Sequence, residues 1–185
     1  SKEGPSLAIG DINKDGAEDV FIGGARGQAG AIYLHTGNGN LQFSNNECFM
    51  TDAGFEDTAA TFCDVDGDGD LDLIVGSGGN IGSDKNLYYT RLYLNNGKGQ
   101  FVRSEHNLPS VKANVSVIAP YDFDGDGDID LFIGSRSVPG IYGVNPQHLL
   151  LINNGNGTFT DGTERYAYEL KDAGMITDAR WIEMD

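Results

Sequence analysis

One nine-residue pattern, Asp-x-Asp/Asn-x-Asp-Gly-x-x-Asp, occurs three times in this chain of 185 residues. Its copies span residues 11–19, 64–72 and 122–130, at intervals of 53 and 58 residues. They hold 14 of the 28 acidic residues and one of the 12 basic residues, so most of the net charge of −16 lies in three short loops. Carboxylates packed this densely repel one another unless a cation lies among them. The chain is therefore expected to fold as a repeat array built around cation-binding loops.

Calcium chemistry accounts for the spacing within each loop, because this ion takes about six to eight oxygen ligands. Positions 1, 3, 5 and 9 are expected to supply side-chain oxygens and position 7 its main-chain carbonyl, while the glycine at position 6 permits a sharp turn with positive φ. The expected metal ligands are Asp11, Asn13, Asp15, Ala17 and Asp19 in the first loop, Asp64, Asp66, Asp68, Asp70 and Asp72 in the second, and Asp122, Asp124, Asp126, Asp128 and Asp130 in the third.

Two details of this ligand set lead to further expectations. The carboxylates of Asp70 and Asp128, at position 7, are expected to point outward, because this position binds through its main chain. The first loop has Asn13 at position 3 and one carboxylate fewer than the others, so its calcium is expected to be the weakest of about three ions.

The loops are not EF-hands, which close with a glutamate at position 12 and lie between helices. Position 12 is Ile22, Val75 or Ile133 here. Each loop runs directly into a short apolar segment that ends in glycine, at residues 20–23, 73–76 and 131–134. Such segments are typical of buried strands, so the ion is expected to lie between strands.

A second repeated feature lies between the loops. Residues 92–101 and 150–159, and more loosely 32–43, read as an apolar run, an Asn/Gly turn and an aromatic residue, which is typical of a β-hairpin. Each unit of about 55–60 residues then has four strands, as in a propeller blade. The sequence predicts an all-β fold of about three β-propeller blades of four antiparallel strands, with units at 5–57, 58–115 and 116–178.

The ends of this array carry two smaller predictions. Residues 179–185 are expected to start the next blade, because Asp185 aligns with the first ligand of the preceding loops. Residues 163–172 are the best candidate for a helix, with Tyr166 and Leu170 on one face, and this helix is expected to cap a blade.

On these loops and hairpins the chain resembles the FG-GAP/VCBS-repeat family, the calcium-loop propellers that include integrin α-subunit heads. It is most similar to the ASPIC/UnbV branch, the cartilage acidic protein type, in residues 149–161 (Leu-Leu-Leu-Ile-Asn-Asn-Gly-Asn-Gly-Thr-Phe-Thr-Asp) and 174–181 (Gly-Met-Ile-Thr-Asp-Ala-Arg-Trp). The resemblance implies a propeller of about seven blades, with metal loops on one face and ligand contacts on the other. Three blades do not close a ring, so the expected partners include the remaining blades of a longer chain or a second copy.

Charge and composition argue against several other classes of protein. The acidic surface would repel phosphate backbones, so nucleic acid is not expected as a partner. Apolar runs of about six residues are too short for a membrane helix of about 20 residues, so no membrane insertion is expected. The histidines His35, His106 and His148 have no metal-type spacing, and no phosphate-binding loop or nucleophile elbow occurs. Cys48 and Cys63 either pair or remain free thiols.

Candidate ligand-binding residues follow the second strand of each unit, where the chain reaches the end opposite the metal loops. These segments and the insertions after them carry aromatic and arginine side chains that are expected to be exposed and to suit recognition of sugars or proteins, although ordinary loop packing is the alternative. The candidates are Arg26, Tyr88, Tyr89, Arg91, Arg136 and Tyr142.

Together these features predict a calcium-stabilised binding module without catalytic activity, whose ligand is an extracellular carbohydrate or protein. Millimolar calcium outside the cytosol would fill loops of modest affinity, so a secreted, cell-surface or periplasmic location is expected. The alternative is part of a propeller enzyme that acts on polysaccharide, of the lyase or dehydratase type. Such an enzyme would need a cluster of Lys, Arg, Tyr or His at one end of the propeller channel.

Overall fold

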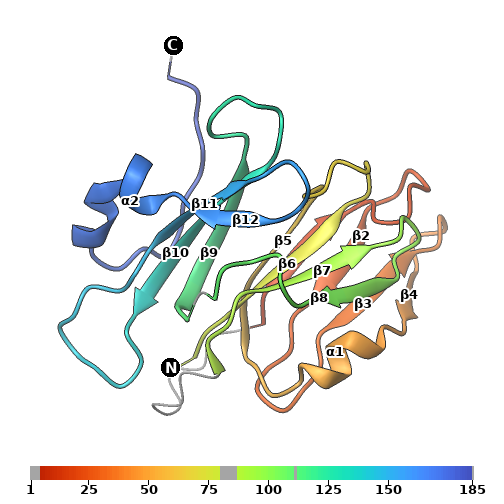
Figure 1. Cartoon of the computed structure of the whole chain (residues 1–185). Helices are drawn as coiled ribbons and strands as arrows, with labels where there is room; N and C mark the ends of the chain where they lie inside the picture. Colours follow the sequence, from red (N-terminus) through yellow and green to blue (C-terminus); the bar gives the residue numbers. More distant parts are fainter. Residues whose placement is uncertain (1–4, 80–86, 111, 185) are drawn as a thin grey trace.

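The computed structural model describes residues 5–79, 87–110 and 112–184, and they form three sheets of four antiparallel strands each (Figure 1). We call these sheets blades 1, 2 and 3, in chain order. Within each blade, strands that are neighbours in sequence are also neighbours in the sheet. The prediction of an all-β fold built from four-stranded antiparallel blades is confirmed.

The strands of each blade are as follows. Blade 1 contains β1 (Leu7–Gly10), β2 (Asp19–Ile22), β3 (Ala31–His35) and β4 (Leu41–Ser44). Blade 2 contains β5 (Asp57–Cys63), β6 (Asp72–Ser77), β7 (Arg91–Asn95) and β8 (Phe101–Ser104). Blade 3 contains β9 (Asn114–Tyr121), β10 (Asp130–Ser137), β11 (Leu149–Asn153) and β12 (Phe159–Asp161).

Each acidic loop connects the first and second strands of its blade, and each Asn/Gly turn connects the third and fourth strands. Because strand direction alternates in an antiparallel sheet, both connections of one blade lie at the same end of that sheet. We call this the loop end. The connections between second and third strands, including residues 138–147, lie at the other end, which we call the opposite end.

The core lies between the blades, in two clusters of buried side chains. Every residue of β6 is buried, because blade 2 has a neighbouring blade on both faces. Leu73 and Val75 of β6 belong to the cluster shared with blade 1, and Ile74 belongs to the cluster shared with blade 3. In β2 only alternate residues are buried, so Phe21 faces blade 2 whereas Ile22 is 39% exposed.

Glycines near the ends of the second strands make room for the next element of the array. A Cβ atom on Gly76 of β6 would lie closer than 3.0 Å to the side chain of Val115 in β9. A Cβ atom on Gly134 of β10 would lie 2.9 Å from the side chain of Ile176, in the segment that follows blade 3. Ile176 also donates its main-chain amide to the carbonyl of Ser135, at 3.1 Å. The segment after blade 3 is therefore seated on that blade as β9 is seated on blade 2.

The helices α1 (Glu47–Thr51), α2 (Thr163–Tyr166) and η2 (Tyr168–Asp172) are each only four or five residues long. The predicted helix over 163–172 is two pieces, α2 and η2, separated at Ala167, whose φ of −144° is not helical. The sequence did not predict α1, which is held by Phe49 against Tyr93, with ring centroids 5.0 Å apart. None of these helices has the length and apolar character needed to cross a membrane.

The two cysteines do not form a disulfide. Cys63 is buried at the end of β5, and Cys48 is half-buried in α1. Burial raises the pKa of both thiols, that of Cys48 to about 11, so both are expected to stay protonated and unreactive at neutral pH. Of the two alternatives that the sequence left open, the structure has the free thiols.

Candidate metal centres

The three acidic loops share one backbone conformation. At positions 4 and 6 every residue has a positive φ angle: 60° and 86° for Lys14 and Gly16, 75° and 83° for Gly67 and Gly69, and 77° and 98° for Gly125 and Gly127. The expected positive φ at position 6 is confirmed. Lys14 is the one non-glycine residue with a positive φ among the described residues, and it adopts the conformation that glycine has in the other loops.

The aspartate at position 1 of each loop gathers the loop amides around its carboxylate. Asp64 accepts hydrogen bonds of 2.8 Å from the main-chain amides of Gly67 and Gly69, one on each oxygen. In the third loop, Asp122 accepts from Gly125 at 2.8 Å and from Gly127 at 3.1 Å. This pattern fixes the carboxylate at the centre of the loop rather than in solvent.

The aspartate at position 9 joins the loop to the third strand of its own blade. Asp72 is only 1% exposed, and its oxygens accept amide hydrogens from Val65 at 3.1 Å and Asn95 at 2.9 Å. The same two bonds recur at Asp19, with Ile12 and His35, and at Asp130, with Phe123 and Asn153. Position 9 therefore holds each loop in place, in addition to offering oxygens to an ion.

In two loops the carboxylates at positions 1, 3 and 9 converge. One ligand oxygen from each of Asp64, Asp66 and Asp72 lies within 4.8 Å of the others, and so do those of Asp122, Asp124 and Asp130. Three anionic oxygens at this spacing suit a hard cation such as Ca²⁺, which prefers oxygen ligands at about 2.3–2.6 Å. In the first loop the side chain at position 3 is the amide of Asn13, which offers one neutral oxygen.

Burial and mutual repulsion disfavour the charged form of these carboxyls, and a bound cation would offset both effects. Burial raises the pKa of Asp72 to about 7, and the neighbouring Asp66 and Asp68 add to the rise. Burial likewise raises the pKa of Asp19 and Asp130. A bound cation would favour the ionised form of each carboxyl, so metal binding and proton release are coupled at these sites.

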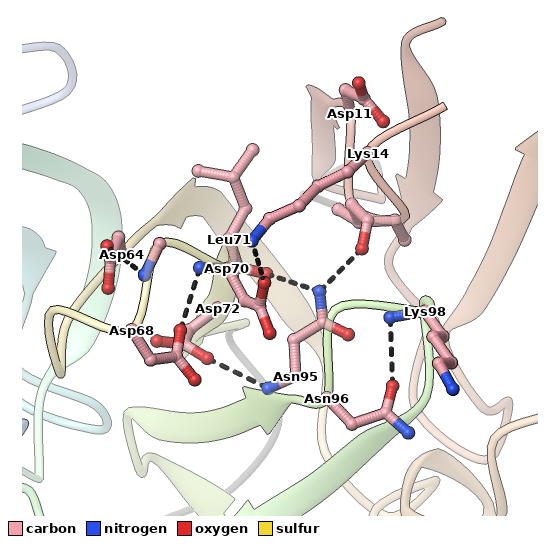
Figure 2. Close-up of polar contacts among 12 residues, drawn as sticks. Asp11, Lys14, Asp64, Asp68, Asp70, Leu71, Asp72, Asn95, Asn96 and Lys98 are labelled. Atoms are coloured by element: carbon pink, nitrogen blue, oxygen red, sulfur yellow. Dashed lines mark hydrogen bonds and ion pairs between the residues drawn. The ribbon is translucent and has the colours of Figure 1, made fainter. Parts of the chain in front are cut away.

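The aspartates at positions 5 and 7 lie outside these triads. At position 5, Asp68 is exposed and accepts the amide of Asp70 at 2.8 Å, which closes the tight turn of the loop. At position 7, the carboxylate of Asp70 lies against Gly97 of the Asn/Gly turn and pairs with Lys14 at 2.5 Å (Figure 2). Asp128 lies against Gly155 in the same way. Both position-7 carboxylates are thus directed toward the neighbouring turn.

The first asparagine of the Asn/Gly turn links adjacent blades, a role that the sequence analysis missed. The amide nitrogen of Asn95 donates to the carbonyls of Ile12, in the loop of blade 1, and Leu71, in its own loop, at 2.8 and 3.0 Å (Figure 2). Asn153 repeats these bonds with Val65 and Ile129. The available signal was the recurrence of Asn-Asn-Gly-x-Gly, which was interpreted as turn chemistry alone.

At the opposite end, two of the six candidate ligand-binding residues are buried. Arg91 is 3% exposed, and its guanidinium pairs with Asp57 at 2.5 Å and lies 4.5 Å over the ring of Phe55. Tyr88 is 2% exposed and donates its hydroxyl to the carbonyl of Gly79. The expectation that these two side chains are exposed is wrong, because a buried carboxylate, Asp57, draws Arg91 into the interface between blades 1 and 2.

The other four candidates remain at the surface to different degrees. Tyr142 and Arg26 are exposed, and Arg136 is half-buried. Tyr89 is half-buried, with the ammonium group of Lys112 lying 5.1 Å from its ring centroid. Residues 80–86 of the first insertion and Asp185 lie outside the described residues, so the fourth loop predicted from Asp185 stays a prediction.

His148 has a structural environment. Its Nδ1 accepts the amide of Ser135 at 3.1 Å, so Nε2 carries the proton and donates to the carbonyl of Gly174 at 2.9 Å. Both ring nitrogens are therefore engaged in holding the segment after blade 3 against β10. This arrangement leaves neither nitrogen available for proton transfer to a substrate.

Comparison with known proteins extends these observations. A family model described as FG-GAP-like repeat matches residues 11–75 and 77–133. A solved structure of an Agrocybe aegerita lectin, described by its specific recognition of non-reducing terminal N-acetylglucosamine, is similar with a TM-score of 0.54 and 24% sequence identity. The match covers 83% of this chain but 36% of the lectin chain, so this chain spans about a third of the length of that structure. No curated protein matched the sequence.

Proposed function

The chain belongs to the FG-GAP-like repeat family, and from that premise we propose that it is a calcium-stabilised, non-catalytic binding module. The convergence of Asp64, Asp66 and Asp72, repeated 58 residues later, is the observation that carries the proposal. A strongly anionic site whose ligands are all oxygens, present in two blades, is expected where a divalent cation holds each loop together.

Calcium at these loops would contribute substantially to stability. With a dissociation constant near 10⁻⁴ M at about 1 mM calcium, each site adds about 1.4 kcal/mol to the free energy of unfolding. Three independent sites would then add about 4 kcal/mol, a large part of the roughly 5–15 kcal/mol typical of a domain. Because such concentrations are typical outside the cytosol, we place the protein in a secreted, cell-surface or periplasmic setting.

Calorimetric titration of the chelator-treated chain with calcium tests this proposal. We expect a stoichiometry near three, and a loss of one site in each of the variants Asp64→Asn and Asp122→Asn. The matched control is Asp70→Asn, which removes a carboxylate from the same loop at a position expected to bind through its main chain, and which should keep all three sites. Absence of calcium binding to the wild-type chain would overturn the proposal.

For the ligand we propose an extracellular carbohydrate or protein. The lectin structure recognises N-acetylglucosamine, and although an identity of 24% supports a shared fold alone, it makes sugars the first ligands to test. The net charge of −16 disfavours nucleic acid as a partner. Assignment to the ASPIC/UnbV branch is also a proposal, supported by residues 149–161 and 174–181.

We further propose that additional blades, in a longer chain or a second copy, complete the propeller. Two features support this. Ile176 is seated on blade 3 as Val115 is seated on blade 2, which supports a further unit at this end of the array. On the outer face of blade 1, Leu7, Ile9 and Phe43 are each more than half exposed, as expected for a face that meets another blade.

Catalysis on polysaccharide is the alternative function, and it has a direct test. A lyase would release products with a new carbon–carbon double bond, which absorb ultraviolet light, whereas a binding module would give saturable binding without turnover. Incubation of the calcium-loaded chain with acidic polysaccharide, followed by absorbance, separates the two.

A further inference from the structure

A cavity of about 360 Å³ with both apolar and polar lining residues lies at the opposite end of the molecule, at the junction of blades 2 and 3. Its walls come from Tyr88 before β7, from the residues at and just before the start of β9, from the end of β10 and from both ends of the loop 138–147 that joins β10 to β11. This volume falls in the range of small-molecule sites, about 300–1,000 Å³. The cavity is remote from the acidic loops, which are at the loop end of the same blades.

Two buried polar atoms in the wall of this cavity have no hydrogen-bond partner among the described residues. They are Oδ1 of Asn114 and Oγ of Ser135, whose residues are 1% and 0% exposed. The orientation of Asn114 is fixed, because its amide nitrogen donates to Oγ of Ser137 at 2.7 Å and to the carbonyl of Gly79 at 3.3 Å. Buried polar groups are almost always paired, so two unpaired groups at one cavity indicate a missing partner.

Comparison with blade 2 shows why Ser135 lacks a partner. Ser77 of β6 occupies the equivalent position, opposite Asp57 in β5, as Ser135 lies opposite Val115 in β9. The hydroxyl of Ser77 donates to the carbonyl of Tyr89 at 2.7 Å and accepts from Arg91 at 3.2 Å.

Blade 3 has replaced the charged pair that fills this place in blade 2. Arg91 lies opposite Val75, and the residue in the same register of blade 3 is Leu149, opposite Ile133. With leucine in place of arginine, no guanidinium donates to the serine hydroxyl in blade 3. The serine hydroxyl that is internally satisfied in blade 2 has no partner among the described residues in blade 3.

The rim of the cavity adds polar groups that carry no negative charge. Lys112, Asn145 and Gln147 are exposed side chains that contribute an ammonium group and two amides. No carboxylate is among the described residues of the lining, although the chain as a whole carries a net charge of −16. Such a lining suits a ligand rich in hydroxyl groups that also presents an acceptor oxygen to Lys112, and it disfavours a cation.

We infer that this cavity binds one saccharide unit that carries a carbonyl or carboxylate oxygen, as in an N-acetylhexosamine or a hexuronate. The inference rests on the proposed function and names its ligand site and ligand class. The sugar hydroxyls satisfy Asn114 and Ser135 at the inner wall, and the acyl or carboxyl oxygen faces Lys112 at the rim.

The test is a titration of the calcium-loaded chain with three probes, N-acetylglucosamine, galacturonate and glucosamine, followed by calorimetry and by the side-chain amide NMR signals of Asn145 and Gln147. At least one of the first two probes should bind and shift these signals, and which one binds distinguishes an amide carbonyl from a carboxylate. Glucosamine carries an ammonium group in place of the acceptor and should not bind detectably.

Two variants locate the site. Ser135→Ala removes a hydroxyl that has no partner in the described structure, so it should keep the melting temperature of the wild-type chain and weaken probe binding by about fivefold. Lys112→Met should weaken binding by a similar factor. The controls Ser110→Ala and Lys98→Met change exposed residues outside the cavity and should leave binding unchanged.

The outcomes separate this inference from the proposed function. Probe binding that is unchanged in both cavity variants, or equal binding of glucosamine, would overturn the inference and leave the binding module intact. Failure of both expected probes with calcium still bound would also overturn it, and would direct the ligand search toward proteins. Loss of the calcium response itself would overturn the proposed function.

Discussion

The side-chain amide of Asn95 donates a 2.8 Å hydrogen bond to the main-chain carbonyl of Ile12, which lies 83 residues earlier in the chain. The acceptor is in the acidic loop of blade 1, and the donor is at the Asn/Gly turn of blade 2. Asn153 makes the equivalent bond to Val65, from blade 3 to the loop of blade 2. Each acidic loop that has a following blade is therefore part of the contact with that blade, so loop order and blade packing stabilise each other.

Replacing Asn95 with alanine should destabilise the chain. The side chain is buried, and its loss leaves the carbonyls of Ile12 and Leu71 and the amide of Gly99 without their partner. We expect the free energy of unfolding to fall by about 2–4 kcal/mol, measured by urea denaturation in calcium. The adjacent Asn96 is exposed, so Asn96→Ala is the matched control and should change stability by about 0.5 kcal/mol or less. Equal effects of the two variants would contradict the proposal that the hydrogen bonds of Asn95 hold adjacent blades together.

Adding one methyl group at the interface between blades 2 and 3 should also destabilise the chain. In Gly76→Ala the new Cβ would overlap the side chain of Val115, so β9 would have to shift, at a cost of about 1–3 kcal/mol. Gly54→Ala places its Cβ where no atom lies within 4 Å and should be near neutral. Thermal unfolding of both variants measures the difference. A melting temperature for Gly76→Ala equal to the wild-type value would show that the blades are not packed as described.

Removing the ammonium group of Lys14 should strengthen calcium binding by the loop 64–72. This group pairs with Asp70 and lies beside the second loop, where it opposes the charge of an incoming divalent ion. Lys14→Met should raise the calcium affinity of that loop by about three- to fivefold at low ionic strength, and by less at high salt. Calorimetry in a background of Asp11→Asn and Asp122→Asn isolates the loop. Lys171→Met, in η2, is the control, and an unchanged affinity in Lys14→Met would exclude the electrostatic effect.

The calcium-free chain should lose stability as the pH rises. Burial raises the folded-state pKa of Asp72 to about 7, above the usual value of about 3.9. The contribution of Asp72 to the free energy of unfolding is therefore fully present below about pH 4. It is lost as the pH rises through about 7, because the folded state must then ionise a buried carboxyl. In chelator the melting temperature should fall across this window more steeply for the wild-type chain than for Asp72→Asn.

Calcium should reverse this trend, since it requires the ionised carboxylate. The exposed Asp178→Asn is the control for the loss of a charge, and its slope should match that of the wild-type chain. A wild-type slope in chelator equal to that of Asp72→Asn would show that Asp72 is not the titrating group.

Most of the blade architecture was predictable because it depends on local sequence patterns that recur in each blade. The strand order follows from hairpin signals such as residues 92–101 and from apolar segments such as 73–76 that leave each acidic loop. The sharp turn of the loops was also predictable, since the glycine at position 6, such as Gly69, permits a positive φ. These features depend on residues close together in the chain, where spacing alone carries the information.

Features that depend on contacts between distant residues were not predictable in this way. The side chain of Arg91 was expected at the surface, yet it is buried because Asp57 lies 34 residues away in sequence and beside it in space. The short helix α1 is held by Phe49 in a cluster whose other members come from several strands. Because these contacts are distant in sequence, the residues of α1 alone give no strong helix signal. The unpaired Ser135 became apparent only when its surroundings could be compared with those of Ser77.

The most direct test of the central claim, that the acidic loops hold cations which stabilise the fold, is the melting temperature in chelator and in 1 mM calcium. The account predicts that calcium raises the melting temperature by about 5–15 °C, in line with about 4 kcal/mol from three sites, and that the rise is smaller by about a third in Asp64→Asn. Equal melting temperatures with and without calcium would contradict it, and the loops would then be acidic turns without a structural ion.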